Sequence, residues 1–251
     1  MSFKKVYLPI VVIVLLQLFT GCNSESSPEC YRKAGDTLLY DVEVASFNKI
    51  HISPGIELII AQGEEQKVTV QTGENLKEYI TAEVREDGEL FITNSNNCNW
   101  TRDYNSTTVT VTTPVLERIY SASQFAVKSN RILSFPSLTL ESGLHSETAS
   151  GIFDLQLNAE SLLVQDNQSC YYKISGQVTN LNVSFYSGDA RFDGANLVAE
   201  SVYVFHRSSN DIIVNPQQQV SGTIYSTGNL VLKNEPPVVD VEQLYTGHIV
   251  Y

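Results

Sequence analysis

The fold is decided by one short pattern that recurs in the stretches VSFYSGDARF (183–192), VFHRSSNDIIV (204–214) and IYSTGNLVL (224–232). Each stretch has an apolar run, a polar corner and a second apolar run. The corner recurs after 21 residues, from Ser187 to Ser208, and after a further 19, at Thr227. Looser copies stand upstream at 119–123, 138–143 and 162–169. We interpret the tract from Leu116 to Leu232 as a repeat of about 20 residues.

A repeat of this length cannot bury an apolar face by itself, so each copy must pack on the next one. β-branched and aromatic residues at alternating positions favour short strands, and Ser, Gly and Asn favour the bends between them. We therefore expect an all-β chain folded as a single-stranded parallel β-helix, a type of solenoid. A β-sandwich is the alternative, because it also has short strands and frequent turns. The similar corners of the three copies favour the solenoid.

The amino terminus has the pattern of an export signal. Lys4 and Lys5 precede an apolar run over residues 6–19, which is short for a membrane span. The run ends in LFTGC (18–22), which resembles a bacterial lipobox with Cys22 as the acylated residue. We expect residues 1–21 to be a lipoprotein signal peptide, followed by a polar tether. An ordinary cleaved signal or a buried helix is the alternative.

The chain is acidic, with a formal net charge of −12. Removal of residues 1–21 takes away two lysines and no acids, which leaves a charge of −14. Nucleic acids and anionic lipid surfaces need clustered Lys and Arg, so we expect no nucleic-acid partner.

Three cysteines follow Cys22, at spacings that are not typical of a metal site. Cys30 and Cys98 could form a disulfide in an oxidising compartment, with Cys170 as the odd thiol. Three free thiols are the alternative.

Residues 38–113 contain strand-like segments separated by turns. The sequence Asp87-Gly88 between two such segments predicts a hairpin. We expect this region to form a β-rich cap on the first coil, because an open sheet edge invites pairing with other chains.

Several weak motifs occur together in an order that resembles a known family. They are Phe47…Ile50, Gly55–Gly63, Asp87–Ile92, Asn97–Trp100 and Tyr225–Pro236. Together they resemble the putative auto-transporter adhesin family with a head GIN domain, which is found largely in Bacteroidetes. The resemblance implies a right-handed β-helix fronted by a β-rich section, a lipid anchor and a role as an adhesin.

Residue types that bind metals or catalyse reactions are scattered along the chain. The chain has four histidines, His51, His145, His206 and His248. None of them has a second potential ligand at the spacing of a metal site. Motifs for a serine nucleophile or a nucleotide phosphate do not occur. We therefore expect no metal, no cofactor and no catalytic residue.

One acidic set favours an alternative function. Asp189, Arg191 and Asp193 alternate along one predicted strand, and Asp211 should lie near them on the next coil. Because glycoside cleavage uses carboxylates, this set is the alternative hypothesis of a polysaccharide lyase or glycosidase. A solvated strand face with ion pairs between coils is the simpler interpretation.

Aromatic residues near the repeat corners indicate a binding face instead. Exposed rings in a column would suit contact with a sugar or a protein. The candidates for this face are Tyr120, Tyr186, His206 and Tyr225. The alternative is that these side chains only cover the edges of the coils.

The predicted organisation has five parts. They are the signal peptide (1–21), the acylated Cys22 with its tether (22–37), the cap (38–113), the β-helix (114–237) and a C-terminal cap (238–251). The predicted function is a non-enzymatic, lipid-anchored binding or adhesion module of the cell envelope, in the outer membrane, with a host or cell-surface glycan or protein as partner. A purely structural envelope lipoprotein is a further alternative.

Overall fold

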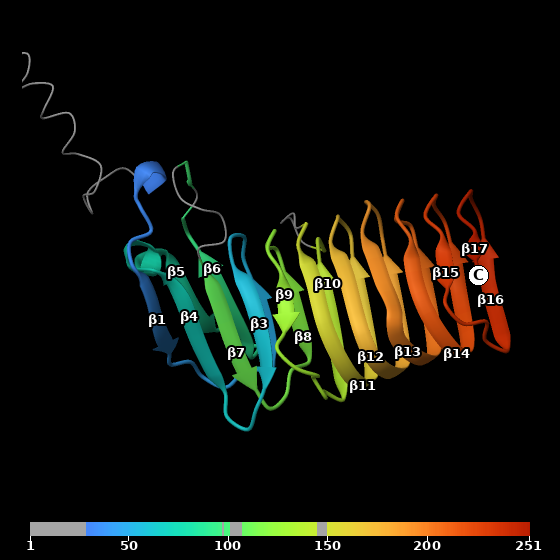
Figure 1. Cartoon of the computed structure of the whole chain (residues 1–251), viewed down its shortest axis with the longest axis horizontal. Coiled ribbons are helices and arrows are strands. Elements are labelled where there is room, and N and C mark those ends of the chain that lie inside the picture. The colour runs from blue at the N-terminus through green and yellow to red at the C-terminus, as the bar shows by residue number, and fades with distance from the viewer. Residues whose placement is uncertain (1–28, 97, 101–106, 145–149) are drawn as a thin grey trace, which may run out of the picture.

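The computed structural model describes residues 29–96, 98–100, 107–144 and 150–251. Its strands are stacked side by side along one axis (Figure 1). In the first half of the chain they are β1 (Thr37–Val42), β2 (Lys49–Ile52), β3 (Glu57–Gln62), β4 (Lys67–Gly73), β5 (Ile80–Val84), β6 (Glu89–Asn94), β7 (Thr108–Thr113), β8 (Arg118–Ser121) and β9 (Val127–Ser129). In the second half they are β10 (Ser137–Ser142), β11 (Ile152–Asp166), β12 (Tyr171–Phe185), β13 (Arg191–His206), β14 (Ile212–Ile224), β15 (Leu230–Leu232), β16 (Val238–Gln243) and β17 (Ile249–Val250).

Each long strand contributes to two faces of the stack. The first half of β11 pairs in parallel with β9, through Phe153, whereas its second half pairs with β10, through Leu162. We call the face with the first halves of β11–β14 face 1 and the face with their second halves face 2. Strands β11 to β14 then pair in parallel, each with the next. The predicted single-stranded parallel β-helix is confirmed. The β-sandwich alternative is wrong because these strands form parallel ladders between successive coils rather than two face-packed antiparallel sheets.

The polar corners lie above one another, as the sequence repeat predicts. The Ser209 N–H donates to the Gly188 C=O at 3.1 Å, and the Gly228 N–H donates to the Ser208 C=O at 3.2 Å. Gly188 has a φ of +82°, and a Cβ on it would lie 2.1 Å from the Gln168 carbonyl oxygen of the preceding coil. Only glycine fits this corner without strain.

The core is a continuous column of apolar side chains inside the coils. On face 1 the inward residues are in register from coil to coil, at Phe153, Tyr172, Phe192, Ile212 and Leu230. All five are buried. Full burial of one such side chain stabilises the fold by roughly 1.5–3 kcal/mol, so the stability of each coil depends on its neighbours.

The amino-terminal end shows where chain order and spatial order differ. The coil β2–β3 lies between β6–β7 on one side and β8–β9 on the other, and all four ladders are parallel. Beyond this coil, β4 pairs antiparallel with β7, β5 pairs antiparallel with β6, and β1 pairs with β4. The parallel stack thus includes strands from the region that the sequence analysis assigns to the cap, and the antiparallel strands β1, β4 and β5 cover its end.

A short amino-terminal segment is attached to this end. It contains the 3-10 helix η1 (Glu29–Tyr31), and Cys30 forms a disulfide with Cys98. Cys170 is a buried free thiol. The predicted signal peptide and Cys22 lie outside the described residues. Within the described ranges, we find no helix that is long and apolar enough to span a membrane.

Candidate functional site

A column of aromatic rings lies where face 2 meets the corners of β12, β13 and β14, with a half-buried Phe205 between two exposed tyrosines. The Phe205 ring centroid lies 5.7 Å from that of Tyr186 and 4.9 Å from that of Tyr225, with interplanar angles of 45° at both contacts. Tyr186 is 36% exposed and Tyr225 40%. We call Tyr186, Phe205 and Tyr225 the ring column.

The register of the coils explains this column. Phe185, His206 and Ile224 are in register and point inward. Tyr186 and Tyr225 each follow one of these inward residues and therefore face out. Phe205 precedes His206 by one position, so alternation along β13 turns its ring outward as well.

Two further side chains extend the surface around the ring column. Tyr203 lies two positions before Phe205 on the outer side of β13 and is 44% exposed. Arg207 occupies the backbone position between those of Tyr186 and Tyr225, since its N–H donates to the Phe185 C=O at 2.9 Å. Its side chain is exposed and, within the described part of the chain, forms no ion pair. The surface thus offers flat apolar rings, phenol hydroxyls and one guanidinium.

Two of the four predicted binding residues do not belong to this surface. Tyr120 is only 1% exposed and packs against the His51 ring at 4.5 Å. His206 is fully buried, with Nε2 3.2 Å from the Asn229 carbonyl oxygen. His206 points inward because it is in register with the inward residues Phe185 and Ile224 of the neighbouring coils. The residue in line with Tyr186 and Tyr225 is therefore Arg207.

Phe205 and Arg207 are therefore functional candidates that the sequence analysis missed. A signal for both was present. The run Tyr203-Val-Phe205-His206 alternates with a period of two, and placing Val204 and His206 inside turns Phe205 and Arg207 outward.

The acidic set considered for catalysis is engaged in contacts between coils. The Tyr171 hydroxyl donates to Asp193 Oδ2 at 3.1 Å. The Asp211 carboxylate accepts from both the backbone N–H and the side-chain amide of Asn229, at 3.0 and 3.2 Å. Asp189 is exposed at the corner that precedes Arg191. These contacts favour the interpretation of a solvated strand face over that of converging catalytic acids.

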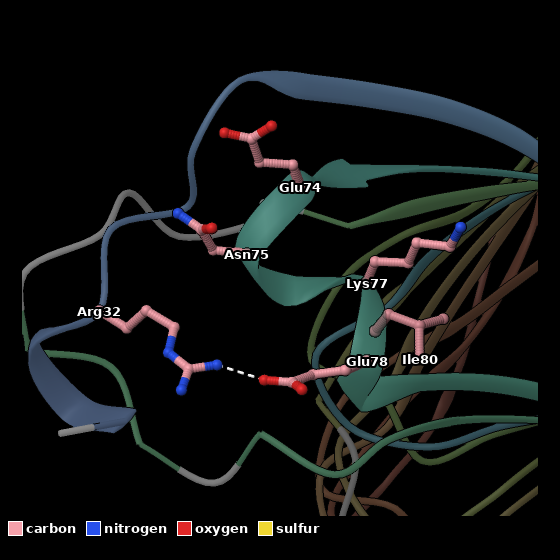
Figure 2. Close-up of a pocket in the computed structure, with 6 residues that line it drawn as sticks. All are labelled: Arg32, Glu74, Asn75, Lys77, Glu78 and Ile80. Atoms are coloured by element: carbon pink, nitrogen blue, oxygen red, sulfur yellow. Dashed lines mark hydrogen bonds and ion pairs between the residues drawn. The ribbon is translucent and has the colours of Figure 1, made fainter. Parts of the chain in front are cut away.

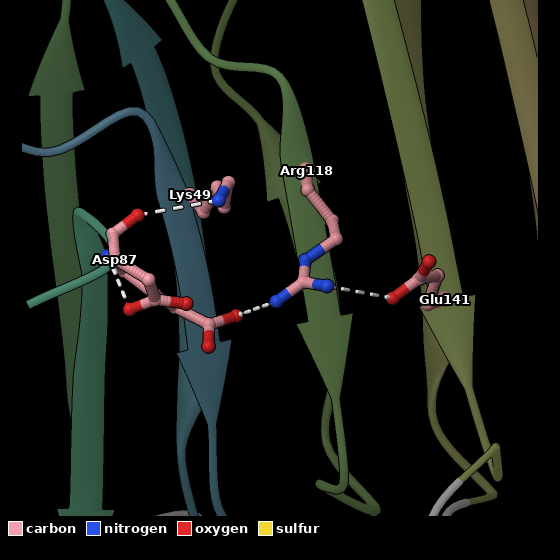
Figure 3. Close-up of polar contacts among 5 residues, drawn as sticks. Lys49, Asp87, Arg118 and Glu141 are labelled. Atoms are coloured by element: carbon pink, nitrogen blue, oxygen red, sulfur yellow. Dashed lines mark hydrogen bonds and ion pairs between the residues drawn. The ribbon is translucent and has the colours of Figure 1, made fainter. Parts of the chain in front are cut away.

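Ion pairs on the outside of the coils also connect one coil to another. Arg118 on β8 forms ion pairs with Glu89 on β6 and Glu141 on β10, so one guanidinium connects three coils (Figure 3). Lys49 on β2 donates to the carbonyl oxygen of Asp87, in the turn before β6, at 3.2 Å. In the ranges that the structure describes, no cluster of His, Cys, Asp and Glu could hold a metal ion.

A cavity of about 610 Å³ lies between the amino-terminal segment and the 3-10 helix η2 (Glu74–Tyr79). Its lining residues are Arg32, Glu74, Asn75, Lys77, Glu78 and Ile80. Figure 2 shows the Arg32 guanidinium directed at the Glu78 carboxylate, with which it forms an ion pair. The Asn75 side chain donates to the Lys33 C=O at 3.2 Å. These contacts connect the amino-terminal segment to η2, and the lining carries charges of both signs.

Comparison with known proteins supports this architecture. A family model described as "Putative auto-transporter adhesin, head GIN domain" matches residues 46–236. A solved structure of a putative adhesin from Bacteroides fragilis has a TM-score of 0.77 at 20% identity, and the match covers 86% of this chain and 98% of that one. No curated protein matches the chain.

Two structures from Parabacteroides distasonis are also similar. A putative adhesin has a TM-score of 0.60 at 18% identity, over 87% of this chain and 99% of that chain. A putative lipid binding protein has a TM-score of 0.59 at 14% identity, over 86% of this chain and 98% of that chain. At these identities the likeness supports the fold alone.

Proposed function

The chain belongs to the putative auto-transporter adhesin, head GIN domain family, and on that premise we propose that it is a non-enzymatic binding module of the cell envelope. The ring column carries this proposal. Rings of Tyr and Phe that are already packed on rigid coils bind with little loss of side-chain entropy, and exposed aromatic residues are enriched at recognition surfaces.

The partner that fits this surface is a glycan or a protein with flat apolar faces. Phenol hydroxyls on Tyr186 and Tyr225 can exchange hydrogen bonds with polar groups at the edge of such a ligand. The exposed guanidinium of Arg207 adds a charge-assisted donor for a carboxylate or sulfate. We therefore expect an acidic glycan or an acidic protein segment to bind more tightly than a neutral one, despite the net negative charge of the chain.

The same proposal includes a lipid anchor on Cys22. The lipobox-like LFTGC at 18–22 and the polar residues after it support this part. The ring column lies on β12–β14, toward the other end of the stack from β1 (Figure 1). An anchor at the amino terminus would therefore leave the ring column far from the membrane, where a ligand outside the cell envelope could reach it.

The test is a binding screen on arrays of host and bacterial glycans and of surface proteins. The wild-type chain is compared with Y186A/F205A/Y225A and with the control Y31A/W100A, which removes an exposed aromatic pair near the disulfide whose ring centroids are 5.2 Å apart. Ligands that are lost only with the ring column support the proposal. Release of cleaved glycan that disappears in D189N/D193N would instead support the alternative of a carbohydrate-active enzyme.

A further inference from the structure

The carboxyl-terminal end of the stack has an open sheet edge. In the part of the chain that the structure describes, β16 pairs only with β14, and β17 pairs only with β15. The Leu244 N–H donates to the Ile224 C=O at 2.9 Å. Because backbone groups alternate along a strand, those of Val239 and Val241 point away from β14. This edge can accept one more strand.

The last coil also exposes apolar side chains that earlier coils bury. Val239 is in register with Val220, and Ile249 with Leu230. Both residues of the earlier coil are fully buried, whereas Val239 is exposed and Ile249 only half-buried. Of 16 exposed large apolar residues among those described, six lie in this coil: Val238, Val239, Leu244, Tyr245, Val250 and Tyr251. An added strand would cover part of this surface.

The charge of this coil indicates which strand would fit. Asp240 and Glu242 are in register with Ser221 and Thr223 of β14, on the outer side of face 2, and both are exposed. Residues 234–251 contain a third acid, Glu235, and no Lys or Arg. An incoming strand with Lys or Arg on its outer side would therefore form favourable pairs across the edge.

A second copy of the chain does not fit this end. Two β16 strands paired in antiparallel fashion would bring Asp240 and Glu242 of one copy close to Asp240 and Glu242 of the other. Stacking against the amino-terminal end would place β16 beside β5, whose outer side carries Glu83, or beside β1, which carries Asp41. An acid of one copy therefore lies beside an acid of the other in each arrangement, although Lys67 pairs with Asp41 at β1.

We propose that the β16 edge is a docking site for an extended segment of another protein, in which apolar residues alternate with Lys or Arg. The segment adds as a strand to face 2. Its apolar residues cover Val239 and Val241, its basic residues lie beside Asp240 and Glu242, and its backbone pairs with the open edge. This site is on the last coil and is separate from the ring column.

The test measures binding of labelled peptides to the full chain by fluorescence anisotropy. The probes are the alternating peptide KVKVKVKV, its acidic counterpart EVEVEVEV and the block peptide KKKKVVVV. The test variants are D240K/E242K and V239P. The control is E160K/E200K, which makes the same charge change at two exposed residues of interior coils.

We expect the wild-type chain to bind KVKVKVKV more tightly than the block peptide. D240K/E242K should weaken this binding by about tenfold and gain affinity for EVEVEVEV, because attraction at two cross-strand positions becomes repulsion. V239P should also weaken binding because it removes an edge donor, whereas E160K/E200K should leave binding within about twofold of wild type.

Three results would overturn the proposal. The first is absence of binding by the alternating peptide. The second is that D240K/E242K and E160K/E200K lose the same affinity for KVKVKVKV, or that the wild-type chain binds the block peptide as tightly as KVKVKVKV. Either outcome would show that the peptide is attracted by net charge alone. The third is a wild-type dimer in light scattering that V239P abolishes, because a second copy would then occupy the edge.

Discussion

The rings of Phe205 and Tyr225 pack 4.9 Å apart on neighbouring coils, although 20 residues separate them in the sequence. Phe205 also contacts Tyr186 on the other side, so it is the central member of the ring column. F205A should lower the free energy of unfolding by about 1–2 kcal/mol, because two ring contacts are lost while little core volume is removed. Y203A is the control, as Tyr203 lies outward on the same strand.

Urea unfolding of both variants measures this difference. A smaller cost for F205A than for Y203A would mean that the contacts of Phe205 with its neighbours contribute nothing to stability.

Arg207 should decide the preference of the surface for acidic ligands. R207A is expected to weaken the binding of an acidic glycan by about tenfold, and that of its neutral counterpart by much less, because only the acidic ligand loses a charge-assisted hydrogen bond. Calorimetric titration of matched acidic and neutral glycans measures both effects. R207K should recover part of the affinity, and equal losses for the two ligands would show that Arg207 acts through packing.

His206 should make the fold sensitive to acid. Burial lowers its pKa to about 4, below the ordinary value near 6.5. The stability that comes from a neutral His206 is therefore complete above pH 6.5 and is lost as the pH falls toward 4. The expected loss is about 3 kcal/mol.

H206L should reduce this slope when urea unfolding is followed from pH 7.5 to 4, and H248L serves as the control because that side chain is exposed. An unchanged slope in H206L would contradict the assignment.

Asp166 should make the fold less stable as the pH rises, which is opposite to the effect of His206. Burial raises its pKa to about 6, although the Gln168 N–H and the Tyr172 hydroxyl, which donate to its carboxylate, lower it. The folded state therefore holds the proton more tightly than the unfolded state, and the contribution of Asp166 falls by about 3 kcal/mol as the pH rises from about 4 to above 6.

D166N should consequently gain stability relative to wild type over the same range. The difference in unfolding free energy between the two proteins, measured at pH 4, 5, 6 and 7, tests this. A constant difference would show that the Asp166 carboxyl titrates alike in the folded and unfolded states.

The repeat and its corners were predictable because they are local. The Ser187, Ser208 and Thr227 corners follow each other at the spacing of one coil, and the structure stacks them directly. The insertion of β2–β3 between β6–β7 and β8–β9 was not predictable, since it depends on pairing between distant segments. The alternation of inward and outward residues along the strand predicts that Phe205 faces out. The prediction that His206 faces out was wrong because it used only the position of His206 near a corner.

The most direct measurement is the affinity of the ring column for a ligand found in the array screen. We expect Y186A/F205A/Y225A to bind this ligand at least about a hundredfold more weakly than wild type, because several central aromatic contacts at the interface are lost. Y31A/W100A should bind within about twofold of wild type. Wild-type affinity in the triple variant, with its fold intact by circular dichroism, would show that the ring column is not the binding surface.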